Sequence, residues 1–80
     1  MSSAKKLSEL EAGSDAEIRG FAPGYSEAGR LREMGLLPGT KIRVIRWAPL
    51  GDPLEIKVRG YNLSIRKCDA EFVEVSVSTP

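Results

Sequence analysis

Hydrophobic and charged residues alternate over much of the chain with a period of two, which is typical of half-buried strands. The signal is clearest where Leu54, Ile56 and Val58 are separated by charged residues. The segments with this pattern are residues 16–21, 40–47, 54–59, 62–66 and 73–77. The sequence therefore predicts five short strands.

A short helix is predicted between the first two strands, over residues 26–34, because hydrophobic residues recur there at threefold spacing. Ser26 is its expected N-cap. Gly35 is expected to end the helix in the left-handed conformation, which brings Leu36 back onto Leu31. Pro38-Gly39 then supplies a turn into the next strand.

Shorter features connect these elements. Leu7 to Leu10 is interpreted as one helical turn, or else as an extended edge segment, with Ser8 and Glu11 at capping-box spacing. Gly60-Tyr61 is a candidate for a type II′ hairpin turn with glycine leading. Residues 67–70 are expected to form a turn.

The chain of 80 residues has room for one small domain, which we place at residues 7–77. Residues 1–6 are expected to be a flexible N-terminus and residues 78–80 a tail. Five short strands are too few for a useful sandwich, whereas one curled sheet hides its edges and one apolar face. The expected fold is mainly β: a small five-stranded barrel with one short helix inserted between strands.

The composition argues against an enzyme. Without histidine, and with Cys68 as the single cysteine, there is no Ser–His or Cys–His pair, and neither a disulfide nor a transition-metal cage within the chain is expected. No phosphate-binding motif occurs among the glycines. We predict no catalytic residue, metal ligand or cofactor. The longest apolar run is far too short to cross a membrane, and the N-terminus does not resemble a signal peptide, so a cytoplasmic location is expected.

Charge is segregated although the formal net charge is only +1. Strand parity predicts one outer face that carries five cations, with Glu55 as its only acid. These cations are Lys41, Arg43, Lys57, Arg59 and Arg66. Two interpretations of this face are about equally favoured. It is either a solvated face that blocks edge pairing, or a surface that binds an acidic partner or a phosphate backbone. Only Trp47 is available there as a stacking aromatic, so nucleic-acid binding ranks second.

Some apolar residues are not buried by the strand alternation. For Trp47 and Leu50, capping of the core is the favoured explanation, although aromatic and basic residues side by side are also typical of an interface. Tyr25, beside the helix start, is similarly ambiguous. Around the predicted helix stop, Arg30, Arg32 and Leu37 are residues that folding does not require.

Several motifs together resemble the ferrous iron transport protein A family. They are Leu7-x-x-Leu10, Ile18-x-Gly20, Arg30-Leu31-x-x-Met34-Gly35-Leu36-x-Pro38-Gly39, Asp52-Pro53-Leu54, Gly60 with Leu63, and Ala70-x-x-Val73-x-Val75. The resemblance implies an SH3-like barrel in the bacterial cytoplasm. It also implies an accessory to a membrane ferrous iron transporter that carries a cytoplasmic GTPase domain. The same SH3-like domain ends iron-dependent repressors, so the pattern identifies the fold better than the role.

We therefore predict a non-enzymatic accessory protein of ferrous iron uptake that binds the GTPase region of the transporter. Its candidate partner-binding residues are Tyr25, Arg30, Arg32, Leu37, Trp47 and Leu50. The alternatives are a barrel that binds nucleic acid through its basic strand face, and a freestanding SH3-like domain of the metal-regulator type. Weak self-association is left open.

Overall fold

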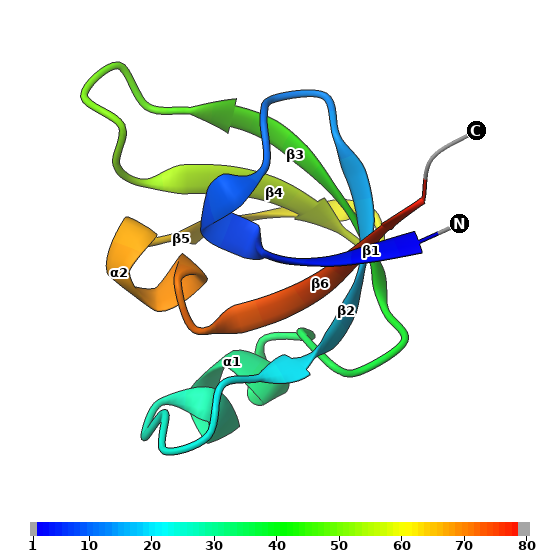
Figure 1. Cartoon of the computed structure of the whole chain (residues 1–80). Helices are drawn as coiled ribbons and strands as arrows, with labels where there is room; N and C mark the ends of the chain where they lie inside the picture. Colours follow the sequence, from blue (N-terminus) through cyan, green and yellow to red (C-terminus); the bar gives the residue numbers. More distant parts are fainter. Residues whose placement is uncertain (1, 79–80) are drawn as a thin grey trace.

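Six antiparallel strands form one curved sheet in the order β1-β6-β2-β3-β4-β5, and its concave side holds the core (Figure 1). The computed structural model describes residues 2–78. The elements are β1 (Ser2–Lys6), the 3-10 turn η1 (Leu7–Glu9), β2 (Asp15–Phe21), α1 (Ala28–Glu33), β3 (Lys41–Trp47), β4 (Leu54–Val58), β5 (Tyr61–Ile65), α2 (Lys67–Ala70) and β6 (Val73–Ser78). The five predicted strands correspond to β2 through β6, and the predicted helix to α1.

The N-terminus differs from the expectation. Instead of fraying, residues 2–6 form β1 and pair with β6, from Ser2 opposite Ser78 to Lys6 opposite Glu74. This makes the sheet six-stranded rather than five-stranded. The reason is that an edge ladder is held by backbone hydrogen bonds, which small polar residues form as well as apolar ones. Ser78 belongs to β6, and residues 1, 79 and 80 lie outside the described residues.

The strand alternation predicts the core correctly. In β3 and β4 the inward side chains are those of Ile42, Val44, Leu54, Ile56 and Val58, and all five are buried. Between Val44 and Arg46 the pairing of β3 with β4 shifts register, which is the mark of a β-bulge. The shift changes which side chains of β3 face outward beyond Val44.

Helix α1 ends as the sequence predicts. Gly35 has φ +110°, its N–H donates to the carbonyl of Arg32, and the N–H of Leu36 donates to the carbonyl of Leu31. This pair of bonds is a Schellman motif, and it places both leucines in the core. The start of α1 differs: its N-cap is Glu27 rather than Ser26, and no side chain caps it. So short a helix is held by packing more than by its caps.

Three local predictions are corrected. The η1 capping bond runs from the N–H of Lys6 to Oε1 of Glu9, at 2.7 Å, rather than between Ser8 and Glu11. The β4–β5 hairpin turns at Arg59 and Gly60, both with positive φ, so it is a type I′ turn and not a II′ turn at Gly60-Tyr61. The expected turn at residues 67–70 is the short helix α2.

Gly35 is required by both its backbone conformation and its surroundings. We expect Gly35→Ala to lower the free energy of unfolding by about 1–3 kcal/mol, because the new Cβ would lie 2.6 Å from the Tyr61 hydroxyl on a left-handed backbone. Gly29→Ala is the matched control, since Gly29 lies within α1 and its Cβ would meet nothing within 4 Å. It should stabilise the protein by up to about 1 kcal/mol. Urea unfolding measures both, and equal effects would contradict this account.

Candidate partner-binding surfaces

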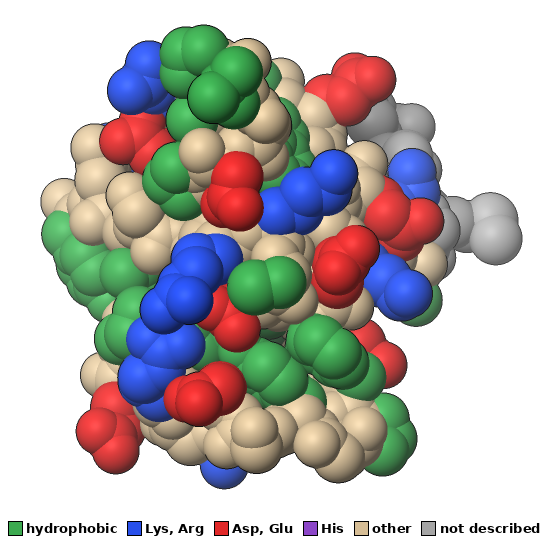
Figure 2. Space-filling model, turned by 90° about the vertical axis from the view of Figure 1, so that its left-hand side faces the viewer, with side chains coloured by type: hydrophobic (Ala, Val, Ile, Leu, Met, Phe, Trp, Pro, Cys, Tyr) green, Lys and Arg blue, Asp and Glu red, His purple; other side chains and the backbone are tan. Residues whose placement is uncertain are grey.

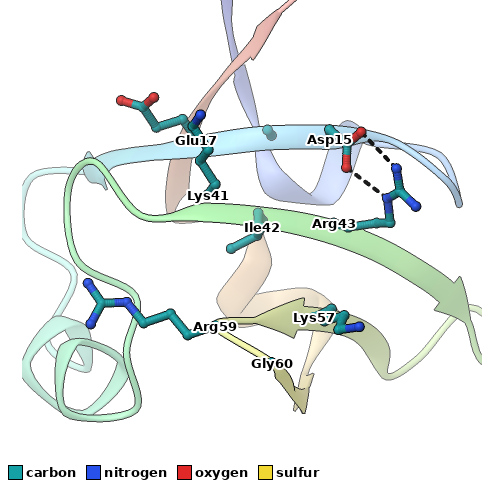
Figure 3. A pocket seen from close by; sticks show the side chains of 9 residues that line it. Asp15, Glu17, Lys41, Ile42, Arg43, Lys57, Arg59 and Gly60 are labelled. Carbon is teal, nitrogen blue, oxygen red and sulfur yellow. Dashed lines mark hydrogen bonds and ion pairs between the residues drawn. The ribbon is translucent and has the colours of Figure 1, made fainter.

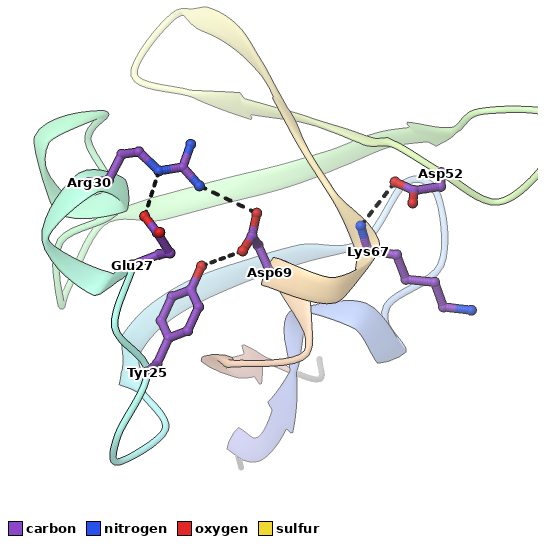
Figure 4. A network of polar contacts seen from close by, with 6 residues as sticks. All are labelled: Tyr25, Glu27, Arg30, Asp52, Lys67 and Asp69. Carbon is purple, nitrogen blue, oxygen red and sulfur yellow. Dashed lines mark hydrogen bonds and ion pairs between the residues drawn. The ribbon is translucent and has the colours of Figure 1, made fainter.

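A polar network joins the loop before α1, α1 itself and α2 (Figure 4). The Tyr25 hydroxyl donates to Oδ1 of Asp69 at 2.6 Å. Arg30 lies between two carboxylates, with Nε 3.1 Å from Oε2 of Glu27 and Nη2 3.6 Å from Oδ2 of Asp69. Because Asp69 comes from α2 and the other residues come from the α1 region, the network fixes the two helices relative to each other.

Aromatic rings stack beside this network. The ring centroid of Tyr25 is 4.8 Å from that of Phe72, nearly parallel to it, and 5.9 Å from that of Phe21. The guanidinium carbon of Arg32 lies 5.7 Å from the Phe21 centroid, within the range of a cation–π contact. Phe72 is 41% exposed. We define the helix-side surface as Phe21, Tyr25, Arg30, Arg32 and Phe72.

The phenol of Tyr25 is electrostatically constrained. Burial disfavours its charged form, and the hydrogen bond to Asp69 favours its neutral form, so both raise the pKa of Tyr25 above its ordinary value. Tyr25 is therefore held as a hydrogen-bond donor to Asp69. This contact within the fold accounts for part of its partial burial, so the sequence alone did not show whether Tyr25 serves the core or an interface.

The structure brings only half of the predicted partner-binding residues together. Tyr25, Arg30 and Arg32 share the helix-side surface, whereas Leu50 is 97% exposed in the β3–β4 loop, at the other end of the molecule (Figure 1). Leu37 is also exposed, in the segment after α1. Figure 2 shows hydrophobic side chains at the level of the β3–β4 loop and again around α1, with both basic and acidic side chains between the two regions.

Trp47 is mainly part of the core. It is half-buried, packs against the core and donates from Nε1 to the carbonyl of Leu10 at 2.9 Å. The favoured interpretation of core capping is therefore confirmed for Trp47. Leu50 does not share it, because the loop carries its side chain into solvent.

Sequence reasoning missed Phe21 and Phe72, which complete the helix-side surface, and Asp69, which completes the polar network beside it. Phe21 lies opposite Val73 in the β2–β6 ladder, which places Phe72 beside the same strand end. These residues lie some fifty positions apart in the sequence. The one available signal was that two aromatic residues each border a predicted strand.

An outward groove of about 580 Å³ lies over β2, β3 and β4 (Figure 3). Of the five cations predicted to share one face, four line it: Lys41, Arg43, Lys57 and Arg59. Arg66 is not among its lining residues. Glu55 pairs instead with Arg46, with Nε and Oε1 2.6 Å apart.

The groove is less basic than the sequence predicts. Strand β2 pairs with β3 and brings Asp15 opposite Arg43 and Glu17 opposite Lys41, so Glu55 is not the only acid on this side of the sheet. Arg43 contacts both carboxylate oxygens of Asp15, at 2.8 and 3.0 Å. No aromatic side chain is among the lining residues, so stacking of single-stranded nucleic acid finds no platform in this groove.

Within residues 2–78, no helix is both long and apolar enough to cross a membrane. Over the same range, no three side chains of His, Cys, Asp or Glu gather closely enough to hold a metal ion.

The fold defines a structural class, the small SH3-like barrel. The model of the FeoA domain family matches residues 5–77, and the chain belongs to that family. The predicted resemblance is thus confirmed. FeoA domains are non-catalytic domains of ferrous iron transport, so the prediction that the chain is not an enzyme is confirmed as well.

Relatives with solved structures share the whole fold. The chain is 34% identical to a FeoA-like protein from Clostridium acetobutylicum, with a TM-score of 0.90 over 100% of this chain and 93% of that one. It is 41% identical to FeoA from Chlorobium tepidum, with a TM-score of 0.85 over 94% and 71% of the two chains. T. acidophilum IdeR is 22% identical, with a TM-score of 0.81 over 95% of this chain and 35% of the IdeR chain. That likeness shows the fold alone.

One relative is much longer than this chain. It is the Fe(2+) transport protein A/Fe(2+) transporter FeoB fusion protein from Porphyromonas gingivalis, 38% identical over 72 residues. The match covers 90% of this chain but only 8% of the fusion protein.

Tyr25→Phe tests the polar network while keeping the stacked ring. We expect the free energy of unfolding near neutral pH to fall by about 1–2 kcal/mol, because the bond to a charged acceptor is lost. Since the folded-state pKa of Tyr25 is raised, its stabilising effect is present below the ordinary tyrosine pKa and is lost as pH rises through the folded value. The difference between the two proteins should therefore shrink above about pH 10. Urea unfolding against pH measures it, and a constant difference would contradict the assignment.

The groove ion pair can be tested by an NMR titration of Asp15. Its side-chain bond to Arg43 lowers the pKa of Asp15, so Arg43→Gln should return that pKa towards its ordinary range. Any stabilisation from this pair is present above the ordinary aspartate pKa and is lost as pH falls through the lower folded value. Arg46→Gln is the control, because Arg46 pairs with Glu55. An Asp15 pKa that responds equally to both substitutions would contradict the pairing.

Proposed function

We propose that this chain is an accessory protein of ferrous iron uptake that binds the cytoplasmic GTPase region of a membrane ferrous iron transporter. The observation that carries the proposal is the fusion of a matching domain to a ferrous iron transporter in one polypeptide. Two domains in one chain meet at a high effective concentration, an arrangement that suits domains that contact each other. A cytoplasmic location follows from this proposal.

The helix-side surface is the stronger candidate for the contact. It combines exposed aromatic surface on Phe72 with the guanidinium groups of Arg30 and Arg32, the residue types that dominate the centres of interfaces. The polar network holds Tyr25 and Arg30 in place before binding, which reduces the entropy lost on association. The second candidate surface is the β3–β4 loop with Leu50, and Leu37 lies outside both.

Regulation of the transporter requires unequal binding. A bound domain shifts a conformational equilibrium only by the difference in its affinity for the two conformations. We therefore propose that the chain prefers one nucleotide state of the GTPase region. The metal ion is the cargo of the transporter in this scheme, and no metal contact by this chain is invoked.

Titration of the chain against the isolated GTPase region tests the proposal in three states: without nucleotide, with GDP and with a non-hydrolysable GTP analogue. We expect binding in at least one state, and a difference in affinity of about fivefold or more between states. Arg32→Gln should weaken the complex by about tenfold. Lys5→Gln on β1, which removes the same charge elsewhere, should not.

The outcomes separate the parts of the proposal. Absence of binding in all states refutes the function, and equal binding in all states refutes the regulatory step. Loss of affinity in Leu50→Ser but not in Arg32→Gln would move the interface to the β3–β4 loop.

A further inference from the structure

The two edges of the sheet are protected to different degrees. Edge strands expose unpaired backbone groups, and proteins commonly blunt them with lysine or proline. Strand β1 carries the exposed Lys5 and Lys6. Strand β5 has the sequence Tyr-Asn-Leu-Ser-Ile, with no charge and no proline. The β5 edge therefore lacks the usual protection against pairing with another strand.

The hairpin register shows which backbone groups are free. Val58 and Tyr61 flank a two-residue turn, so they form a hydrogen-bonded pair. The next pair along the ladder, Lys57 with Asn62, is therefore a non-hydrogen-bonded pair. By this alternation the N–H and C=O groups of Asn62 and Ser64 point away from β4. Among the described residues, no turn, loop or side-chain hydrogen bond occupies them. Both side chains are exposed.

We propose that β5 pairs with β5 of a second copy of this chain, antiparallel, about a two-fold axis at Leu63. In this register Asn62 faces Ser64 of the copy, and each pair exchanges both backbone hydrogen bonds. Leu63 meets its own equivalent at a position where side chains approach most closely. Tyr61 lies opposite Ile65 of the copy, whose side chain is buried in its own core.

The register is also compatible with the charges on β4. Lys57 lies beside Asn62 and Glu55 beside Ser64, so each row across the joined sheet has Lys57 at one end and Glu55 of the copy at the other. These charges are about 14 Å apart, three strand spacings, and they are opposite in sign. On the core side of β5, Tyr61 is 44% exposed while its hydroxyl donates to the carbonyl of Met34, and Leu63 is half-buried against the core. This proposal concerns another surface than the transporter contact and does not rest on it.

Sedimentation velocity over a range of concentrations, up to about 1 mM, tests the dimer. The wild-type chain should shift from monomer towards dimer as concentration rises. Ser64→Pro removes the outward N–H and should raise the dissociation constant about tenfold or more, whereas Ser64→Ala keeps the N–H and should not. Amide exchange at Asn62 and Ser64 should slow with concentration, while exchange at Gly60 in the turn should not.

A charge pair tests the register even if Ser64→Pro does not fold. Leu63→Lys and Leu63→Glu should each be monomeric, because the two-fold axis places like charges opposite each other. An equal mixture of the two should form a dimer again. A wild-type chain that stays monomeric throughout, or a dimer insensitive to Ser64→Pro, would overturn the proposal. If the mixture of Leu63→Lys and Leu63→Glu stays monomeric, this register is wrong. If the amides of Asn62 and Ser64 are protected only when the GTPase region is added, the partner of β5 is not a second copy of this chain.

Discussion

The close approach of Gly35 to Tyr61 is the constraint on which the rest of the barrel depends. The Tyr61 hydroxyl donates to the carbonyl of Met34, directly before the glycine. This contact ties the end of α1 to the β4–β5 hairpin, while Leu31 and Leu36 enter the core on either side of the helix stop. A Cβ at position 35 would lie 2.6 Å from the Tyr61 hydroxyl, so the contact between the end of α1 and the hairpin would have to shift.

A second set of contacts joins α2 to the β3–β4 loop and to the segment before α1. The side chain of Asp52, in the β3–β4 loop, accepts the N–H of Lys67 at the start of α2, at 3.0 Å. On the same helix, Asp69 accepts the Tyr25 hydroxyl. Two carboxylates thus hold α2 between the β3–β4 loop and the α1 region. The β3–β4 loop and the helix-side surface therefore both contact the same short helix.

The outer surface of the barrel carries regions of different charge and composition. The groove over β2 to β4 holds two carboxylates among its four cations, and one of the cations, Arg43, is paired with Asp15. The helix-side surface combines preorganised aromatic and cationic groups, and the β5 edge offers free backbone groups without charge. A single chain of this size thus presents separate surfaces that suit a transporter domain and a second copy.

The sequence by itself determined five of the six strands, β2 to β6, together with α1 and its Gly35 stop, because these depend on residue periodicity and on local backbone geometry. It also identified the FeoA family through residues that are mostly explained by folding. Only the tertiary structure decided the sixth strand, the carboxylates in the basic groove and the stack of Phe21, Tyr25 and Phe72. These depend on pairing between distant segments: β1 on β6, β2 on β3, and β2 on β6. The period of a strand shows which face is buried, but it does not show which strand lies beside it.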